Sequence, residues 1–196
     1  MPRTSKKAER TEEILRACFR CVARYGVEGS TLERIAEEAG LRRSLVRHFV
    51  GNRDELMQKM AHWVIEQSNQ QWDGFLQQLP KEDAVPWLLE GLFGSDNSDA
   101  EFTLVMESLI FSAGRDPELK QLMQDWFHHF VEGIRQVLQQ DYPNIDVTTL
   151  QATAFGIISL YFNVDSLTPL GKSEDYRQLA YQAAKQLLIP LEKPKE

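Results

Sequence analysis

Apolar residues recur every three or four positions along most of the chain, which is the spacing of helices that bury one face. No stretch alternates apolar and polar residues as a half-buried strand would. The pattern predicts helices over about residues 9–25, 31–39, 42–49, 53–79, 83–93, 100–113, 117–142, 147–167 and 173–189. We therefore expect an all-α protein.

The stretch from Ser30 to Arg53 predicts two short helices joined by a tight turn. Ser30 can cap the first helix, and Glu33 three residues later completes a capping box. Gly40 follows the last apolar position, where a left-handed backbone needs a residue without Cβ. The expected inward residues are Leu32, Ile35, Ala36 and Ala39 on the first helix and Leu45, Val46 and Phe49 on the second. This spacing is that of a helix-turn-helix, whose second helix lies in the major groove of DNA.

The outward face of the second helix is basic. Its residues are Arg43, Ser44, Arg47 and His48. No acidic residue lies between Leu41 and Gly51, whereas a solvated face of an acidic protein would normally mix charges. We therefore expect this face to contact DNA. Arg42, Arg43 and Arg47 offer forked donors for guanine O6 and N7 or for phosphate, and the sequence leaves open which of them reads a base.

Charge is distributed unevenly along the chain, whose formal net charge is −7. Residues 1–53 contain 12 Lys and Arg against 7 Asp and Glu, a net of +5. Residues 54–196 contain 10 against 22, a net of −12. A basic head on an acidic body fits a nucleic-acid contact confined to one end. We therefore divide the chain into a three-helix DNA-binding domain, residues 1–53, and a helical domain, residues 54–196.

Nothing in the sequence indicates export or a membrane. The first residues lack the apolar stretch of a secretory signal, and no apolar run is expected to cross a bilayer. Two cysteines are too few for a disulfide framework, so we expect a cytoplasmic protein. Residues 1–8 are expected to form a basic arm, whose Arg3, Lys6 and Lys7 either reach DNA or stay free of it.

Few residues have the spacing of a catalytic or metal site. Cys18 and Cys21 form a C-x-x-C, but no second ligand pair follows at zinc-finger spacing, and both fall on a face expected to be buried. His128 and His129 would diverge by about 100° on a helix, so they cannot easily share a metal ion. The chain has no glycine-rich phosphate loop, H-E-x-x-H or G-x-S-x-G. We expect no enzyme, no cofactor and no metal site.

From about residue 9 to residue 60 the sequence resembles the tetracycline-repressor (TetR) family of bacterial transcription regulators. The family pattern reads T-x-x-x-I-A-x-x-A-G-V-S-K-G-T-L-Y-H-Y-F-x-x-K-x-x-L. The residues identical to it are Thr31, Ile35, Ala36, Ala39, Gly40, His48 and Leu56. The close replacements are Leu41, Arg43, Ser44, Val46, Phe49 and Arg53. Arg42, Arg47 and Val50 depart from the pattern, which has Ser, an aromatic residue and Phe at those positions.

The resemblance implies which residues meet a roughly palindromic DNA operator. The implied DNA-facing residues are Arg43, Ser44, Leu45, Arg47 and His48. It also implies that Thr31 and Arg53 hold phosphates at helix N-termini, where anions bind readily. Arg42 adds a further charge in place of the serine cap.

For residues 54–196 the resemblance implies a helical bundle that binds a small molecule and pairs with a second subunit. The helices at 117–142 and 147–167 carry more apolar surface than one subunit can bury, which independently favours a homodimer. The interface is expected at Trp126, Phe127, Phe130, Ile134, Ala152, Gly156 and Ser159.

An effector site is expected among aromatic and methionine residues of the central helices. The candidates are Trp63, Trp72, Trp87, Phe93, Phe102, Met106, Phe111, Phe155 and Tyr161, although for any one of them ordinary core is the favoured explanation. The acids among them are Glu66, Glu90, Glu107 and Asp165. This mixture suits a partly apolar cation, although acids on outer helix faces explain it as well.

The sequence thus predicts a ligand-responsive, sequence-specific regulator of transcription. We expect a repressor that a small molecule releases from its operator. An activator is the least favoured alternative, after a helical protein-interaction module that has lost DNA binding. The arginines on the second helix argue against that loss.

Overall fold

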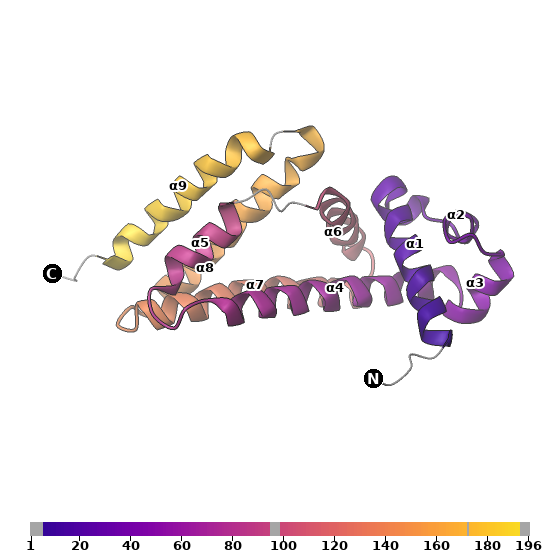
Figure 1. Ribbon diagram of the computed structural model, residues 1–196, viewed down its shortest axis with the longest axis horizontal. Coiled ribbons are helices and arrows are strands. Elements are labelled where there is room, and N and C mark those ends of the chain that lie inside the picture. Colours follow the sequence, from indigo (N-terminus) through magenta and orange to yellow (C-terminus); the bar gives the residue numbers. More distant parts are fainter. Residues whose placement is uncertain (1–5, 95–98, 172, 193–196) are drawn as a thin grey trace. The chain divides into compact units, whose positions relative to one another are not determined.

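The computed structural model describes residues 6–94, 99–171 and 173–192, and within them every regular element is helical (Figure 1). The helices are α1 (Lys6–Gly29), α2 (Leu32–Glu38), α3 (Arg43–Val50), α4 (Arg53–Gln78), α5 (Ala84–Phe93), α6 (Ala100–Ala113), α7 (Pro117–Asp141), α8 (Val147–Ser166), the short 3₁₀ helix η1 (Thr168–Leu170) and α9 (Ser173–Glu192). The predicted all-α class is confirmed, and each predicted helix is present.

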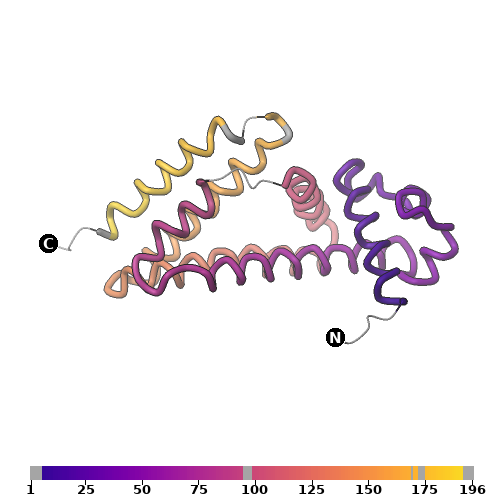
Figure 2. The backbone as a smooth tube through the Cα atoms, viewed as in Figure 1, coloured from indigo at the N-terminus to yellow at the C-terminus, as the bar shows by residue number. Residues whose placement is uncertain are grey.

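The helices form two compact units. Unit 1 contains the described residues up to Ser68 together with Glu101–Met123. Unit 2 contains Asn69–Ala100 and the described chain from Gln124 onward. The long helices α4 and α7 therefore contribute residues to both units. Each is one continuous helix in the trace of Figure 2. Unit 1 extends beyond residues 1–53, which remain the predicted DNA-binding domain.

In unit 1, α1, α2 and α3 pack around a small apolar core. Its fully buried members include Ile14, Cys18, Val22, Ile35 and Val46. Gly26 has a φ of 69°, so the regular helix of α1 is interrupted at the residue where the sequence predicted its end. Gly40 has a φ of 63° in the turn between α2 and α3, as the helix-turn-helix pattern requires.

The cap of α2 differs by one residue from the prediction. Thr31 is the N-cap, and its side-chain oxygen accepts a hydrogen bond from the Arg34 backbone N–H at 3.3 Å. Ser30, the predicted cap, is fully buried and donates to the Gly26 carbonyl at 2.8 Å. Glu33 therefore does not stand at the position that a capping box requires.

Two further predictions for unit 1 need correction. Leu45 does not point inward but is 39% exposed, and Val50 at the end of α3 is fully buried. The apolar contact of α3 is therefore made by Val46 and Val50, which are one helical turn apart. At the start of the chain, Lys6 and Lys7 belong to α1 rather than to an arm, and Arg3 lies outside the described residues.

Unit 2 contains the end of α4 from Asn69 onward, α5, most of α7, α8 and α9. Its fully buried side chains include Leu88, Ile134, Leu138, Leu150, Ile157 and Ile158. α8 and α9 pack closely, because a Cβ atom added at Gly156 of α8 would lie 2.8 Å from the Leu187 side chain of α9. α9 continues past the predicted end, through Pro190 to Glu192, since a proline in the last turn removes only one hydrogen bond near the helix end.

α8 is more apolar than the sequence analysis allowed for. By length and composition alone, Val147–Ser166 could cross a membrane, with a mean hydropathy of 1.3. A single helix of this kind is weak evidence, because core helices of soluble proteins meet the same criterion. Only 33% of the apolar stretch is buried within the chain, so much of α8 remains available to a partner.

Candidate nucleic-acid interface

The helix-turn-helix exposes one basic side of α3. Val46 and Val50 are fully buried and fix the helix against the core of unit 1. The exposed residues at the start of α3 and along its opposite side are Arg42, Arg43, Ser44, Leu45, Arg47 and His48. All the residues of this segment that were expected to face DNA are therefore on the surface, and their contact with DNA stays a prediction.

The start of α3 carries two adjacent arginines in different settings. Arg42 is the N-cap residue and makes no side-chain hydrogen bond to the helix, so the serine cap of the family pattern has no substitute here. Arg43 is the first residue of α3, and its Nε atom lies 3.0 Å from Oε1 of Glu33 on α2. Both side chains of this pair are 61% exposed. Sequence analysis of α3 alone missed this acid, because Glu33 is ten positions earlier in the chain.

Glu38 at the end of α2 fastens that helix to α1. Its carboxylate oxygens lie 2.5 Å from Arg20 Nε and 2.9 Å from Arg24 Nη1. The hydrogen bond from Arg20 holds the pKa of Glu38 below its usual range, so the carboxylate is charged at neutral pH. Since α2 also packs on α3, the clamp supports the direction in which the basic side of α3 faces.

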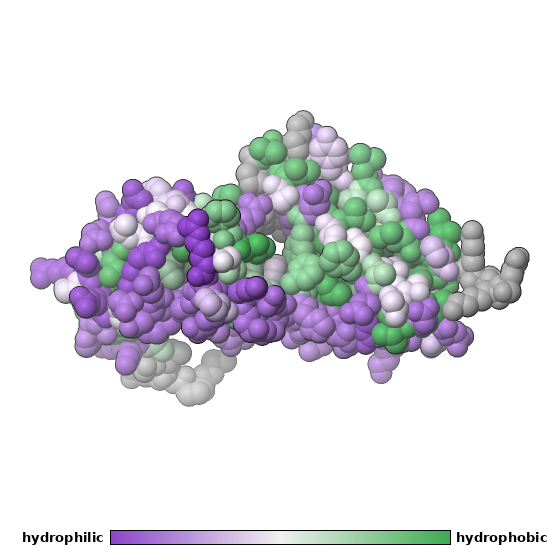
Figure 3. Space-filling model, turned by 180° about the vertical axis from the view of Figure 1, so that it is seen from behind, coloured by the Kyte–Doolittle hydropathy of each residue, from purple (hydrophilic) through white to green (hydrophobic). Residues whose placement is uncertain are grey.

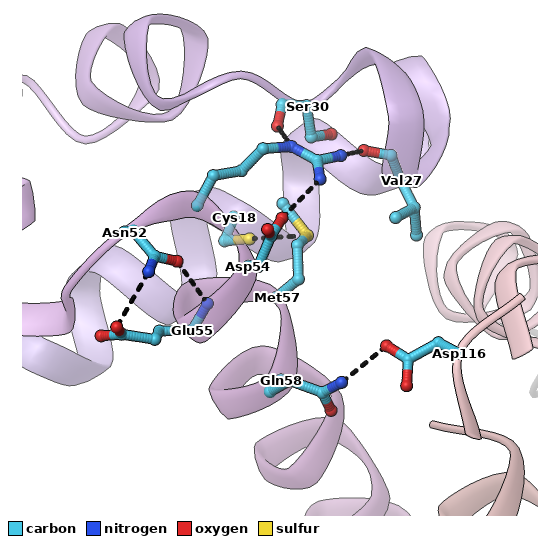
Figure 4. A network of polar contacts seen from close by, with 10 residues as sticks. Cys18, Val27, Ser30, Asn52, Asp54, Glu55, Met57, Gln58 and Asp116 are labelled. Atoms are coloured by element: carbon cyan, nitrogen blue, oxygen red, sulfur yellow. Dashed lines mark hydrogen bonds and ion pairs between the residues drawn. The ribbon is translucent and has the colours of Figure 1, made fainter. Parts of the chain in front are cut away.

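Thr31 and Arg53, the two implied phosphate ligands, have different environments. Thr31 is exposed at the start of α2. Arg53 Nε donates to the Ser30 carbonyl at 3.1 Å, and its Nη2 donates to the Val27 carbonyl (Figure 4). Its Nη1 lies 3.1 Å from Asp54. The guanidinium thus ties the start of α4 to the chain between α1 and α2, and its contact with phosphate stays a prediction.

The N-termini of α4 and α7 are capped and joined by polar contacts within unit 1 (Figure 4). Asn52 Oδ1 accepts from the Glu55 backbone N–H at 2.9 Å, and Asn52 Nδ2 donates to Glu55 Oε1 at 2.9 Å, which is a reciprocal cap. Asp116 caps α7 by accepting from the Glu118 N–H at 3.0 Å. Gln58 of α4 donates to the other oxygen of Asp116 at 2.7 Å.

Cys18 and Cys21 are buried in unit 1 and form no disulfide. Cys18 Sγ lies 3.9 Å from the Met57 sulfur, and burial raises the pKa of its thiol. Such a thiol is unreactive and packs as an apolar group. Within the described part of the chain, no three His, Cys, Asp or Glu side chains are grouped to hold a metal ion.

The nine candidate effector residues do not form one cluster. Trp87, Phe111 and Phe155 are on the surface, with 65%, 74% and 53% exposure. Trp63 belongs to unit 1, where its ring meets that of Phe19 edge-on at 6.3 Å. The other candidates of unit 1 are Phe102 and Met106, and those of unit 2 with little exposure are Trp72, Phe93 and Tyr161.

Trp72 belongs to an aromatic cluster in unit 2. Its ring stacks on that of Phe130 with 4.7 Å between centroids, and Phe130 also meets Trp126 at 5.2 Å. Trp72 Nε1 and Asn69 Oδ1, one turn earlier on α4, are buried and have no hydrogen-bond partner among the described residues. A buried donor and acceptor left in this way are costly unless a ligand or water completes them.

The predicted interface residues of α7 lie in the core of their own subunit. Trp126, Phe130 and Ile134 are 3%, 8% and 0% exposed, so a second subunit cannot reach them without disrupting unit 2. They were expected on an interface because the apolar stripe of α7 is wide, but α4 and α8 cover it. Phe127 and Ser159 are half-buried, Ala152 is exposed and Gly156 packs on Leu187 of the same chain.

The acids that suggested a cationic effector are mostly in solvent. Glu66, Glu90 and Glu107 are exposed. Asp165 is nearly buried and lies 3.3 Å from Arg177, which is itself 6% exposed. Its negative charge is therefore already compensated within unit 2.

Comparisons with known proteins point to one class. No protein-family model matches the chain. The chain is 41% identical over 64 residues to the HTH-type transcriptional repressor AcnR of Corynebacterium jeikeium, which covers 32% of this chain and 34% of that protein. It is 32% identical over 92 residues to the HTH-type transcriptional regulator PksA of Bacillus subtilis, covering 46% and 45%. The matches thus span less than half the length of these curated relatives.

Solved structures match over nearly the whole chain. A TetR transcription regulator from Haloarcula marismortui has a TM-score of 0.75 at 15% identity, covering 92% of this chain and 96% of that one. A TetR-family transcriptional regulator from Cytophaga hutchinsonii has a TM-score of 0.72 at 16% identity, covering 98% and 100%. The helix-turn-helix, the shared stretches of sequence and this likeness together confirm the resemblance: the chain has the fold of the TetR family of transcription regulators.

Proposed function

We propose that this protein is a sequence-specific DNA-binding regulator of transcription, acting as a repressor. The observation that carries the proposal is the exposed basic side of α3 on a helix-turn-helix whose core is fully buried. Arginines and a histidine at this place match the electrostatic footprint of a DNA contact. The repressor assignment follows the name of the relative AcnR, and an activator is the alternative.

Selection from a randomised duplex library tests this function. The full-length protein should enrich a two-fold symmetric sequence whose half-sites are about 34–36 Å apart, the spacing of two recognition helices in a dimer. Binding to the selected duplex should weaken steeply with salt, because phosphate contacts release counterions. If no duplex is enriched even at low ionic strength, the helical interaction module that lacks DNA binding becomes the better account.

The second copy required by a symmetric operator would bind at α8 and α9. Phe155 on α8 and Tyr176, Leu179 and Leu187 on α9 are 53%, 48%, 62% and 37% exposed. The three residues of α9 recur at helical spacing and so share one side of it. Apolar side chains also gather on one face of unit 2 in Figure 3. Exposed apolar side chains that gather in this way are typical of an interface between subunits.

The effector would bind in unit 2 at the aromatic cluster around Trp72. Stacked aromatic rings with a buried donor and acceptor, Trp72 Nε1 and Asn69 Oδ1, match the composition of small-molecule sites. Because Asp165 is paired with Arg177, a neutral aromatic compound with its own acceptor and donor fits this cluster better than the cation suggested by the sequence.

A panel of neutral aromatic compounds, compared with lipophilic cations, tests the effector site. A binding compound should raise the melting temperature and weaken binding to the selected duplex. Trp72→Phe keeps an aromatic ring but removes the N–H donor, so it should reduce both effects. Trp87→Phe on the surface is the matched control. Equal effects of the two variants would place the effector elsewhere.

We further propose a cytoplasmic protein without enzymatic activity.

A further inference from the structure

The pair formed by Arg43 and Glu33 assigns the arginine that reads a base. Three arginines lie at the start and on the exposed side of α3, and the sequence gives no reason to choose among them. Only Arg43 has an acidic partner among the described residues, with its Nε atom 3.0 Å from Glu33 Oε1. The assignment rests on the DNA-binding function proposed above and concerns which contact each arginine makes.

Position on the helix singles out Arg43 first. In a helix-turn-helix, the N-terminal residues of the recognition helix contact base edges. Arg43 is the first residue of α3, whereas Arg47 is one turn further along and Arg42 is the cap residue outside the helix. Arg43 therefore stands where base contacts are usually made.

The closest contact of the ion pair is on the stem side of the Arg43 guanidinium. A guanidinium carries five N–H donors, and bidentate contact to guanine O6 and N7 uses its two terminal nitrogens. The Arg43 atom nearest to Glu33 is Nε, the nitrogen next to the side-chain stem. A carboxylate on that side can orient the planar group while the two terminal nitrogens face a base.

The one-residue shift of the α2 cap makes this pairing available. If Ser30 were the cap, Glu33 would turn back to the helix start in a capping box. Because Thr31 is the cap, the Glu33 carboxylate is free to meet Arg43. Both side chains are 61% exposed, and an ion pair so exposed contributes little to folding stability. The main effect of this ion pair is therefore on the orientation of the Arg43 side chain and not on stability.

We infer that Arg43 reads a guanine in each half-site, that Glu33 is the residue that positions it, and that Arg42 and Arg47 bind phosphates. A lysine cannot replace an arginine held in this way, because it lacks the fork. Restricting a flexible arginine before binding lowers the cost of ordering it on the base. Glu33 therefore acts on sequence preference rather than on general affinity for DNA.

The test begins with a duplex selected by the wild-type protein from the randomised library. Each position of the half-site is then replaced by the other three base pairs, and dissociation constants are measured for every variant. The wild type should prefer one guanine by about 5- to 150-fold, the range of a bidentate contact. Arg43→Lys should remove that preference. Glu33→Gln should reduce it by about two- to fivefold, the size of one exposed ion pair.

Matched controls separate positioning from charge. Glu37→Gln removes the same charge from an exposed position of α2 and should leave every base preference unchanged. Arg42→Gln and Arg47→Gln should lower affinity at all positions alike and make the salt dependence shallower. The double variant Glu33→Gln with Arg43→Lys should be no less selective than Arg43→Lys alone.

Three results would overturn the inference. Unchanged preferences in Glu33→Gln would show that Glu33 does not position Arg43. A preference abolished by Arg42→Gln or Arg47→Gln would assign the base to another arginine. A position altered by Glu33→Gln but not by Arg43→Lys would mean that Glu33 meets the base itself. If the wild type enriches no duplex at all, the proposed function fails before this question arises.

Discussion

The exposed side of α3 in unit 1 is basic, whereas the exposed sides of α8 and α9 in unit 2 carry large apolar side chains. The exposed side of α3 in unit 1 carries arginines held on a buried core. On unit 2, Phe155 and Leu179 are 53% and 62% exposed, although each could contribute to a core. A charged surface attracts a charged partner without being buried, but an apolar surface stabilises a complex only when it is covered. The contrast fits the two partners proposed above, DNA for the exposed side of α3 and a second copy of the chain for α8 and α9.

Both units hold buried polar atoms that have no hydrogen-bond partner among the described residues. In unit 1 one such atom is Gln58 Oε1, although Gln58 Nε2 donates to Asp116. In unit 2 they include Trp72 Nε1 and Asn69 Oδ1, and the Trp72 ring stacks on that of Phe130. Unpaired polar atoms beside stacked aromatic rings match the composition of small-molecule sites, which is why we propose the effector response for unit 2.

A charge placed in the apolar surface should have the largest effect. Leu179→Glu would put a carboxylate into the proposed α8–α9 interface, where it cannot be solvated, and the dimer should dissociate. Light scattering at micromolar concentration would follow the mass. Gln178→Glu adds the same charge about 100° around the helix and should leave the dimer intact. A wild-type protein that is already monomeric at that concentration would contradict the assignment.

Replacing one buried isoleucine by alanine in each core should separate the roles of the two units. Ile35 in unit 1 and Ile157 in unit 2 are both fully buried, and replacing either by alanine should cost about 2–5 kcal/mol of unfolding free energy. Ile35→Ala should weaken DNA binding more than the dimer, because it loosens α2 behind α3. Ile157→Ala should do the reverse. Urea denaturation, binding to the selected duplex and light scattering would be compared, and identical patterns would show that the units do not divide function.

The contribution of the Arg47 charge to DNA binding can be measured from the salt dependence of the affinity. Replacing it with tyrosine, the kind of residue that the family pattern has there, should make the plot of log K against log salt shallower by about 0.9 for each phosphate that position 47 no longer neutralises. Fluorescence anisotropy with the selected duplex would provide the slopes. The account requires a change, so equal slopes for Arg47→Tyr and the wild type would exclude a phosphate-binding role for Arg47.

The smallest expected effect concerns the charged clamps of the two units. Arg20 lowers the pKa of Glu38 in unit 1, and the hydrogen bond from Arg135 lowers the pKa of Glu132 in unit 2 to about 2. A carboxyl with a lowered pKa stabilises the fold above its unfolded value, near 4.5, and loses this contribution as pH falls towards its folded value. Both groups are partly exposed, so each should contribute less than about 1 kcal/mol.

The measurement is the urea midpoint of Glu38→Gln and of Glu132→Gln against the wild type, at neutral and at acidic pH. Each variant should be slightly less stable at pH 7, and the difference should shrink below about pH 4. Of the two, only Glu38→Gln should also weaken binding to DNA at pH 7, because Glu38 fastens the helix-turn-helix. A deficit that grows on acidification would contradict the stated direction of the pKa shifts.

Local signals explain why the helix-turn-helix could be predicted in detail. The turn glycine Gly40 and the spacing of Ile35 and Val46 depend on neighbours within a few residues. Contacts between residues further apart in the chain were not predicted. Arg43 meets an acid on α2, and Arg53 meets carbonyls more than twenty positions away.

For unit 2 the sequence could predict helices but not which apolar face is covered. Trp72 and Trp87 look alike in the pattern, yet one is 6% exposed and the other 65%. The wide stripe of α7 suggested an interface, but Trp126 and Phe130 are buried by other helices of the same chain. Such differences depend on how helices pack, and helical periodicity alone does not contain that information.

The central claim is that the exposed basic side of α3 is the surface that binds DNA. Its most direct test is a fluorescence anisotropy titration of the selected duplex with a triple variant, Arg42→Gln, Arg43→Gln and Arg47→Gln. The matched control neutralises three exposed lysines away from α3, Lys81→Gln, Lys120→Gln and Lys185→Gln. We expect the α3 variant to lose specific binding and the control to keep it. Equal loss in both, or binding retained by the α3 variant, would contradict the account.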